Sequence, residues 1–218
     1  MYYLPTIMAM TLRKEKAAKL KLGILEHTLK LIGKKPFDDV YVDDICASVK
    51  ISKVTLFKYF PQKEDILLYY FRIWCFHRSV ELSQKPKEGL QGLYFLFDKL
   101  GESLESHPGV IHGLLEYLVN LKRPSKAFPV KPEEKKLMFL KMPNSTAIDI
   151  QSLEQMIEKF ALEAIFKKEI TRSSSTRELT NFILTIFYGS IISGHLTQQS
   201  NNKFYFRKNI EMALKGLA

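Results

Sequence analysis

The sequence predicts an all-α protein of 218 residues, with a small N-terminal three-helix unit that contains a helix-turn-helix and a larger C-terminal helical domain. Apolar residues recur at spacings of three and four along most of the chain, which is the period of an amphipathic helix. The prolines fall between these periodic stretches, where a helix must end. We find no convincing strand run. Hydrophobic residues make up 46% and charged residues 26%, which is the balance of a packed globular chain.

The first helix is expected over Arg13–Lys35. A single apolar stripe runs along it, formed by Ala18, Leu22, Leu25, Leu29 and Ile32. Two short helices follow at Val42–Val49 and Lys53–Tyr59, separated only by Lys50-Ile51-Ser52. So short a connection makes the two helices meet at a steep angle, as in a helix-turn-helix.

Longer helices follow. One begins after Pro61 and runs to about Ser83. Further helices are expected over Glu88–Ser106, Gly109–Leu121, Ser152–Ile170, Thr176–Leu196 and Lys203–Leu217. The region 123–143 holds four of the nine prolines and one short possible helix near Glu133–Lys141. We therefore divide the chain into an N-terminal tail (1–12), a helix-turn-helix domain (13–60), a connecting helix (61–85) and a larger helical domain (86–218).

The net charge of +10 favours an anionic partner, either nucleic acid or an acidic membrane surface. Basic charge is denser near the N-terminus, with 14 Lys and Arg against 8 Asp and Glu over residues 1–78, compared with 19 against 15 over 79–218. The two cysteines form no CxxC and suit a reducing compartment. The first ten residues lack the features of a secretory signal, and Leu179–Gly194 is shorter than a membrane span of ~20 residues. We expect a cytoplasmic protein.

The second short helix carries the side chains that suit a DNA groove. Ser52 is the natural N-cap. Lys53, Val54, Thr55 and Phe57 are expected to meet base edges, because lysine can pair with guanine and the carbon atoms can contact a thymine methyl group. Lys58, Tyr59 and Lys63 are expected to contact phosphates. The competing interpretation is a solvated basic helix whose aromatic residues only pack the small unit.

The run from Val42 to Leu68 resembles the DNA-binding module of TetR-type transcriptional regulators, and the resemblance covers about residues 13–70. Its most specific parts are Ser52-Lys53, Thr55-Leu56-Phe57, Tyr59-Phe60 and Lys63-Glu64. The resemblance implies an all-α homodimer that acts at the bacterial nucleoid in the cytoplasm and not at a membrane. Its larger domain, 86–218, would be the effector-binding and dimerisation domain and would hold an effector pocket. It also implies phosphate contacts at positions matching Ser52, Thr55, Lys58, Tyr59 and Lys63, and base reading around Lys53, Val54 and Phe57.

The sequence departs from that family pattern at three positions. Tyr41 stands where a threonine usually opens the first short helix, Lys50 stands where the turn often has glycine, and Gln62 replaces the usual cap before Lys63. A non-glycine residue in the left-handed conformation is unfavourable by about 1 kcal/mol, so we expect strain in the turn.

The region 179–192 is apolar on nearly every side and must be covered on two sides. We expect one side to meet a second copy of the chain, through residues of this helix and of the last one: Leu184, Tyr188, Ile191, Phe206, Ile210 and Leu214. The alternative is a buried helix in a monomer. A two-fold dimer would read an inverted repeat with half-sites about 34–36 Å apart or a multiple of that. If it meets about eight phosphates, log K should fall with log salt at a slope near −7.

A small-molecule effector, mostly apolar or aromatic, is expected to bind the C-terminal domain. The candidate lining residues are Phe97, Leu100, His112, Tyr117, Met156, Phe160 and Phe187, each of which is also a candidate for ordinary core. Effector binding is expected to weaken operator binding about 5-fold to 150-fold, which would make the protein a repressor released by its ligand. An effector-independent DNA binder is the main alternative.

An enzyme is not expected. The five histidines form no HExxH pair and no zinc-ligand set with cysteine, and no phosphate-binding glycine loop or GxSxG elbow occurs. We therefore expect neither a cofactor nor a metal. A helical enzyme and a basic dimer acting at a membrane remain the more remote alternatives.

Overall fold

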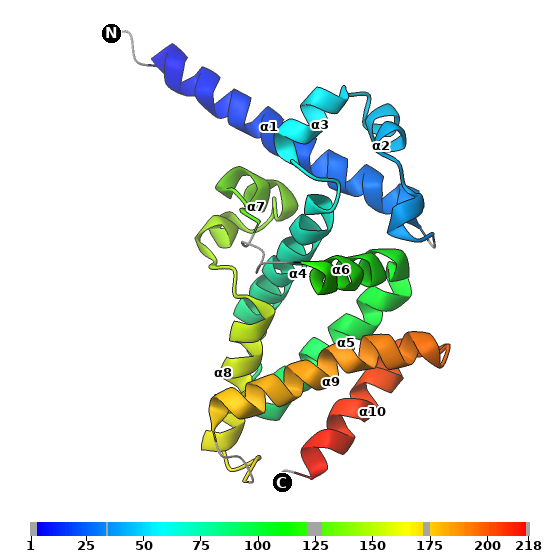
Figure 1. Cartoon of the computed structure of the whole chain (residues 1–218). Coiled ribbons are helices and arrows are strands. Elements are labelled where there is room, and N and C mark those ends of the chain that lie inside the picture. The colour runs from blue at the N-terminus through cyan, green and yellow to red at the C-terminus, as the bar shows by residue number, and fades with distance from the viewer. Residues whose placement is uncertain (1–3, 34, 122–127, 172–174, 217–218) are drawn as a thin grey trace. The chain divides into compact units, whose positions relative to one another are not determined.

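The computed structural model describes residues 4–33, 35–121, 128–171 and 175–216, and every regular element within these ranges is helical (Figure 1). This confirms the predicted all-α class. The chain forms two compact units: residues 1–74 with 109–149, and residues 75–108 with 150–218. This division by compactness places residues 109–149 with the N-terminal residues. The predicted division into 13–60, 61–85 and 86–218 describes functional parts instead, and it stays a prediction.

The first unit contains the predicted helix-turn-helix. Its elements are α1 (Leu4–Ile32), η1 (Phe37–Asp39), α2 (Val42–Val49), α3 (Lys53–Tyr59), the first part of α4 (Asp65–Gln84), most of α6 (Pro108–Asn120), α7 (Pro132–Met138) and η2 (Pro143–Ala147). The predicted bounds of α2 and α3 are correct. Helix α1 begins earlier than predicted, at Leu4, so most of the expected N-terminal tail is helical. It ends at Ile32 and not at Lys35, because Gly33 has a φ of 48° and leaves the helical conformation.

The helices of the first unit pack around a common apolar core. Its fully buried members include Ile24, Ile45, Leu56, Phe60 and Tyr69, which come from α1, α2, α3, the end of α3 and α4. Each of the short helices contributes at least one of these side chains. Tertiary packing therefore holds α2 and α3, which are too short to be stable alone.

The turn between α2 and α3 contains the strain that the sequence predicts. Lys50 has a φ of 59° and a ψ of 50°, so it adopts the left-handed conformation in which glycine is favoured. Tyr41 precedes α2 and makes no side-chain cap, unlike Ser52 before α3.

Replacing Lys50 by glycine is expected to raise the free energy of unfolding by about 1 kcal/mol, because glycine adopts the left-handed conformation without steric penalty. Urea denaturation measures the change. The matched control is Lys16→Gly in α1, where helical backbone makes glycine unfavourable, so the same substitution should lower stability by about 1 kcal/mol. If Lys50→Gly lowered the free energy of unfolding, the result would contradict strain in the left-handed conformation of Lys50.

The second unit is a bundle built from the end of α4, α5 (Gly89–Ser106), α8 (Leu153–Phe166), α9 (Thr176–Leu196) and α10 (Asn202–Lys215). Helix α5 packs against α8 and α10, and α9 packs against the same two helices (Figure 1). The backbones of α5 and α10 approach closely at Gly101, where an added Cβ would lie 2.5 Å from Lys203 Cα. The predicted bounds of α9 are correct.

Helix α9 is long and apolar enough, by length and composition, to cross a membrane. Its residues Leu179, Ile183, Phe187 and Ile191 are buried, and the helix packs against α8 and α10. Core helices of globular proteins have the same length and composition, so these features do not favour a membrane over a packed core.

Candidate nucleic-acid interface

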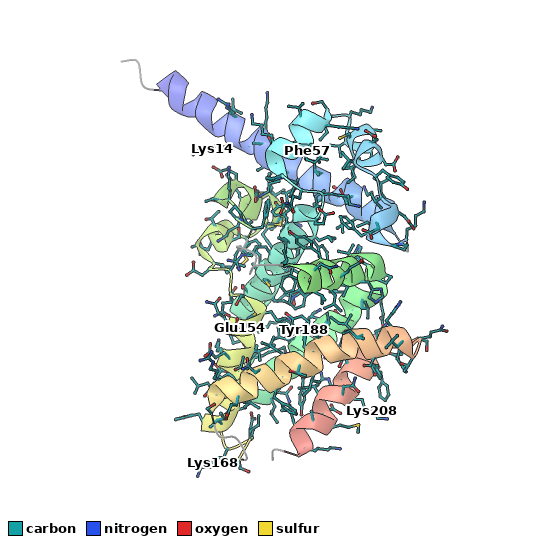
Figure 2. All side chains as sticks on the ribbon, in the orientation of Figure 1. Lys14, Phe57, Glu154, Lys168, Tyr188 and Lys208 are labelled. Carbon is teal, nitrogen blue, oxygen red and sulfur yellow. The ribbon has the colours of Figure 1, made fainter. Side chains whose placement is uncertain are left out.

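The outer face of α3 gathers most of the residues predicted to bind DNA. Ser52, Lys53, Val54, Phe57 and Lys58 are exposed, and Figure 2 marks Phe57 on this helix. Val54 is 82% exposed. The inner face carries Leu56, which is fully buried. Helix α3 is thus packed into its unit through one face, and its other face is exposed to solvent.

Two further predicted residues, Thr55 and Tyr59, are half-buried on the same helix. The backbone N–H of Thr55 donates to Ser52 Oγ at 3.2 Å, and the two hydroxyl oxygens lie 2.9 Å apart. This confirms Ser52 as the N-cap. The cap also uses the Thr55 amide, so that amide is not free to contact a phosphate.

Lys53 is exposed but already paired within the chain. Its Nζ lies 2.8 Å from Asp43 Oδ1 of α2, and both side chains are more than half exposed. The hydrogen bond to Asp43 raises the pKa of Lys53, so the ammonium stays charged. To meet a base edge, Lys53 must exchange the Asp43 carboxylate for a new acceptor.

Lys63 is placed differently from its neighbours on α3. Its Nζ donates to the carbonyl oxygens of Phe37 and Val40, each at 3.3 Å, and lies 4.4 Å from the centroid of the Phe37 ring. Only 17% of its side chain is exposed. These contacts hold η1 and the residue that follows it, Val40. The expected phosphate contact of Lys63 stays a prediction, and this geometry does not favour it.

Tyr41 is a further candidate for DNA contact. In the sequence it stood out only because it replaces the threonine that usually caps the first short helix. It is 68% exposed at the start of α2. The signal in the sequence is an aromatic residue at a position where a capping side chain is usual, and Tyr41 makes no side-chain cap.

The candidate effector-pocket residues belong to both compact units. Five of them, Phe97, Leu100, Met156, Phe160 and Phe187, are buried in the second unit, where the rings of Phe97 and Phe187 are 5.4 Å apart. The other two, His112 and Tyr117, belong to α6 in the first unit. There the Tyr117 hydroxyl donates to Gln62 Oε1 at 3.4 Å, close to the start of α4.

The candidate dimer residues divide into two groups. Ile191, Phe206, Ile210 and Leu214 are buried within their own unit, whereas Leu184 and Tyr188 are half-buried. The exposed apolar side chains of these two helices are Phe182, Ile192 and Leu196 on α9, and Phe204 and Met212 on α10. These residues, and not the buried group, are the ones a second chain can reach.

Comparison with known proteins agrees with the geometry of the first unit. Residues 24–70 match the family model described as "Bacterial regulatory proteins, tetR family". These residues run from the middle of α1 into α4 and include the whole helix-turn-helix. The sequence matches no curated protein.

Several solved structures share the fold of the chain. One is a TetR transcriptional regulator from Rhodococcus sp. RHA1, at 13% identity and a TM-score of 0.57, covering 94% of this chain and 100% of that chain. Another is FadR from Bacillus subtilis in complex with stearoyl-CoA, at 16% identity and a TM-score of 0.59, covering 90% and 99%. A third is FadR from Thermus thermophilus, a TetR family repressor in complex with lauroyl-CoA, at 18% identity and a TM-score of 0.59, covering 91% and 95%.

At these identities the likeness shows a shared fold, and it extends over nearly the whole chain. The family consists of transcription regulators rather than enzymes. Residues 24–70 thus match the family's DNA-binding module, and the chain over most of its length shares the fold of TetR regulators.

Proposed function

We propose that the protein is a homodimeric repressor that binds an inverted-repeat operator in the nucleoid and is released by a small apolar or aromatic effector. The observation that carries the proposal is the exposed face of α3, which presents Lys53, Val54 and Phe57 while Leu56 anchors the helix. A helix held in this way is narrow enough to enter the major groove.

The residues of α3 divide by chemistry into two roles. Lys53 is proposed to donate to guanine O6 or N7, and Val54 and Phe57 to contact thymine methyl groups. Ser52, Thr55, Lys58 and Tyr59 are proposed to contact phosphates, which fix the register of the helix but do not read sequence.

A two-fold dimer is supported by an exposed stripe on α9 that carries three large apolar side chains, a threonine and a glycine. Phe182, Thr185, Gly189, Ile192 and Leu196 are spaced by three and four residues and are all exposed. An added Cβ at Gly189 would meet no atom within 4 Å, so no described part of the chain covers the middle of the stripe. A helix with one buried and one exposed apolar face suits an interface between identical copies.

The effector is proposed to bind among the buried aromatic residues of the second unit, such as Phe97, Phe160 and Phe187. Two similar structures hold acyl-CoA molecules, whose chains are long and apolar. Because these side chains are packed against one another here, ligand binding must displace some of them. Mass spectrometry of the protein as isolated tests for a retained ligand, and a DNA affinity that no ligand changes would favour the effector-independent alternative.

Selection of duplexes from a random pool tests the proposed DNA binding. We expect an enriched inverted repeat, with Lys53→Ala and Phe57→Ala each relaxing the preference at one position per half-site by about 1–3 kcal/mol. Lys208→Ala, an exposed change on α10, is the control and should leave the preference intact. Failure to enrich any sequence would contradict the proposal.

A further inference from the structure

A buried ion pair joins α7 to α1 within the first unit. Lys21 Nζ of α1 donates to Glu134 Oε1 of α7 at 3.2 Å and to the Pro129 carbonyl oxygen at 2.9 Å. Lys21 is 6% exposed and Glu134 is 1% exposed. Figure 1 shows α7 beside α1, on a segment that follows α6 in the chain.

Other buried groups complete the hydrogen bonding of this pair. The Tyr69 hydroxyl of α4 donates to Glu134 Oε2 at 3.1 Å, and the Lys131 backbone N–H donates to the same oxygen at 3.0 Å. Lys21 Nζ also lies 4.0 Å from the centroid of the Tyr69 ring. Burial lowers the pKa of Lys21 and raises that of Tyr69, although Glu134 opposes the shift at Lys21. One carboxylate thus connects three helices: α1, α4 and α7.

The same cluster of buried residues contacts the C-terminal end of α3. Phe60 directly follows α3 and is fully buried. Its ring stacks on Phe128, with 5.5 Å between centroids, and lies 5.5 Å from the ring of Tyr69. Phe128 immediately precedes Pro129, the residue whose carbonyl accepts from Lys21. The end of α3 therefore rests on the segment that the ion pair holds.

A buried ion pair and a buried apolar contact contribute differently to a fold. A well-packed apolar pair is usually as stabilising as a buried ion pair, so stability alone does not explain charge here. Charges that need specific partners favour one arrangement of the helices over others. At its other end, the segment leads through η2 to the crossing between residues 149 and 150, where the chain enters the second unit.

We propose that residues 128–149 form a latch that sets operator affinity. When the Glu134 carboxylate engages Lys21 and Tyr69, the latch fixes Phe128 under Phe60 and holds α3 in the orientation that binds DNA. When the latch releases, α3 loses that support. The chain continues from residue 149 into the second unit, so the latch links that unit to the end of α3 through the chain and the contact between the rings of Phe128 and Phe60. The inference rests on the proposed operator binding.

Hydrogen exchange of the unmodified protein tests the latch without any substitution. Coupling between two equilibria is reciprocal, so if docking of the latch strengthens operator binding, operator binding must strengthen docking by the same factor. The probe is an inverted-repeat duplex selected by the protein itself. We expect the backbone amides of α7 to exchange about 5-fold or more slowly in the saturated complex. Unchanged exchange in α7 would overturn the proposal.

Three variants provide the second test. Glu134→Gln removes the charge that holds the latch and is expected to weaken binding of the selected duplex about 10-fold or more. Glu133→Gln, the same change at the adjacent position, should bind within about 2-fold of wild type, a difference below the range of allosteric coupling. The double change Lys21→Met with Glu134→Leu replaces the ion pair by an apolar contact, keeps the latch docked and should restore most of the affinity.

The outcomes separate the latch from the proposed function. If the wild-type chain selects no duplex, the proposed operator binding itself is wrong. If the wild type binds but Glu134→Gln, shown to be folded by circular dichroism, binds equally well, only the latch is wrong. The latch is also wrong if the folded double variant binds as weakly as Glu134→Gln, because the charge and not the docking would then matter.

Discussion

Replacing Lys21 by methionine is expected to lower the free energy of unfolding by about 3–5 kcal/mol, because the Glu134 carboxylate would stay buried without a cation. Glu134 is 1% exposed, and the Tyr69 hydroxyl and the Lys131 amide cannot replace a full charge. Urea denaturation at neutral pH, followed by circular dichroism, measures the loss.

Two comparisons make this result specific. Lys14→Met is the same substitution at an exposed position of α1, marked in Figure 2, and should leave the midpoint of unfolding nearly unchanged. Lys21→Met with Glu134→Leu should recover most of the stability, since neither charge remains. A loss below about 1 kcal/mol in Lys21→Met would mean that the pair is hydrated rather than buried.

Replacing Ile192 by glutamate is expected to convert the proposed dimer to monomers and to weaken operator binding about 100-fold or more, because two linked half-site contacts become separate events. Ile192 is 48% exposed in the middle of the α9 stripe, so the new charge would be accommodated by a single chain but not by an interface. Sedimentation velocity measures the mass, and fluorescence anisotropy measures the binding of an inverted-repeat duplex.

Gln199→Glu serves as the control for that experiment, since it adds the same charge at an exposed position after the end of α9. It should leave both the mass and the affinity unchanged. An Ile192→Glu variant that remains a dimer would place the interface elsewhere on the chain.

The sequence predicts the helix-turn-helix well because its signals are local. The bounds of α2 and α3 follow from apolar periodicity and from the Ser52 cap, which are properties of adjacent residues. The left-handed Lys50 could also be expected, since so short a turn requires such a residue. The outward face of α3 follows from the burial of Leu56.

Other features depend on contacts between distant residues and could not be predicted. Lys21 lies on a basic helix and its sequence context suggests a solvated charge, but Glu134 is 113 positions away. Helices α9 and α10 are apolar on several sides, so periodicity alone could not show that Phe206 and Ile210 face their own unit.

Salt dependence of operator binding tests the central claim most directly, because counterion release counts the phosphates that a protein neutralises. We expect a dimer to bind a selected inverted repeat with a slope of log K against log salt of about −7, which corresponds to about eight phosphate contacts, four from each subunit. A slope near zero, or equal affinity for every duplex at low salt, would contradict the claim that α3 binds in the major groove.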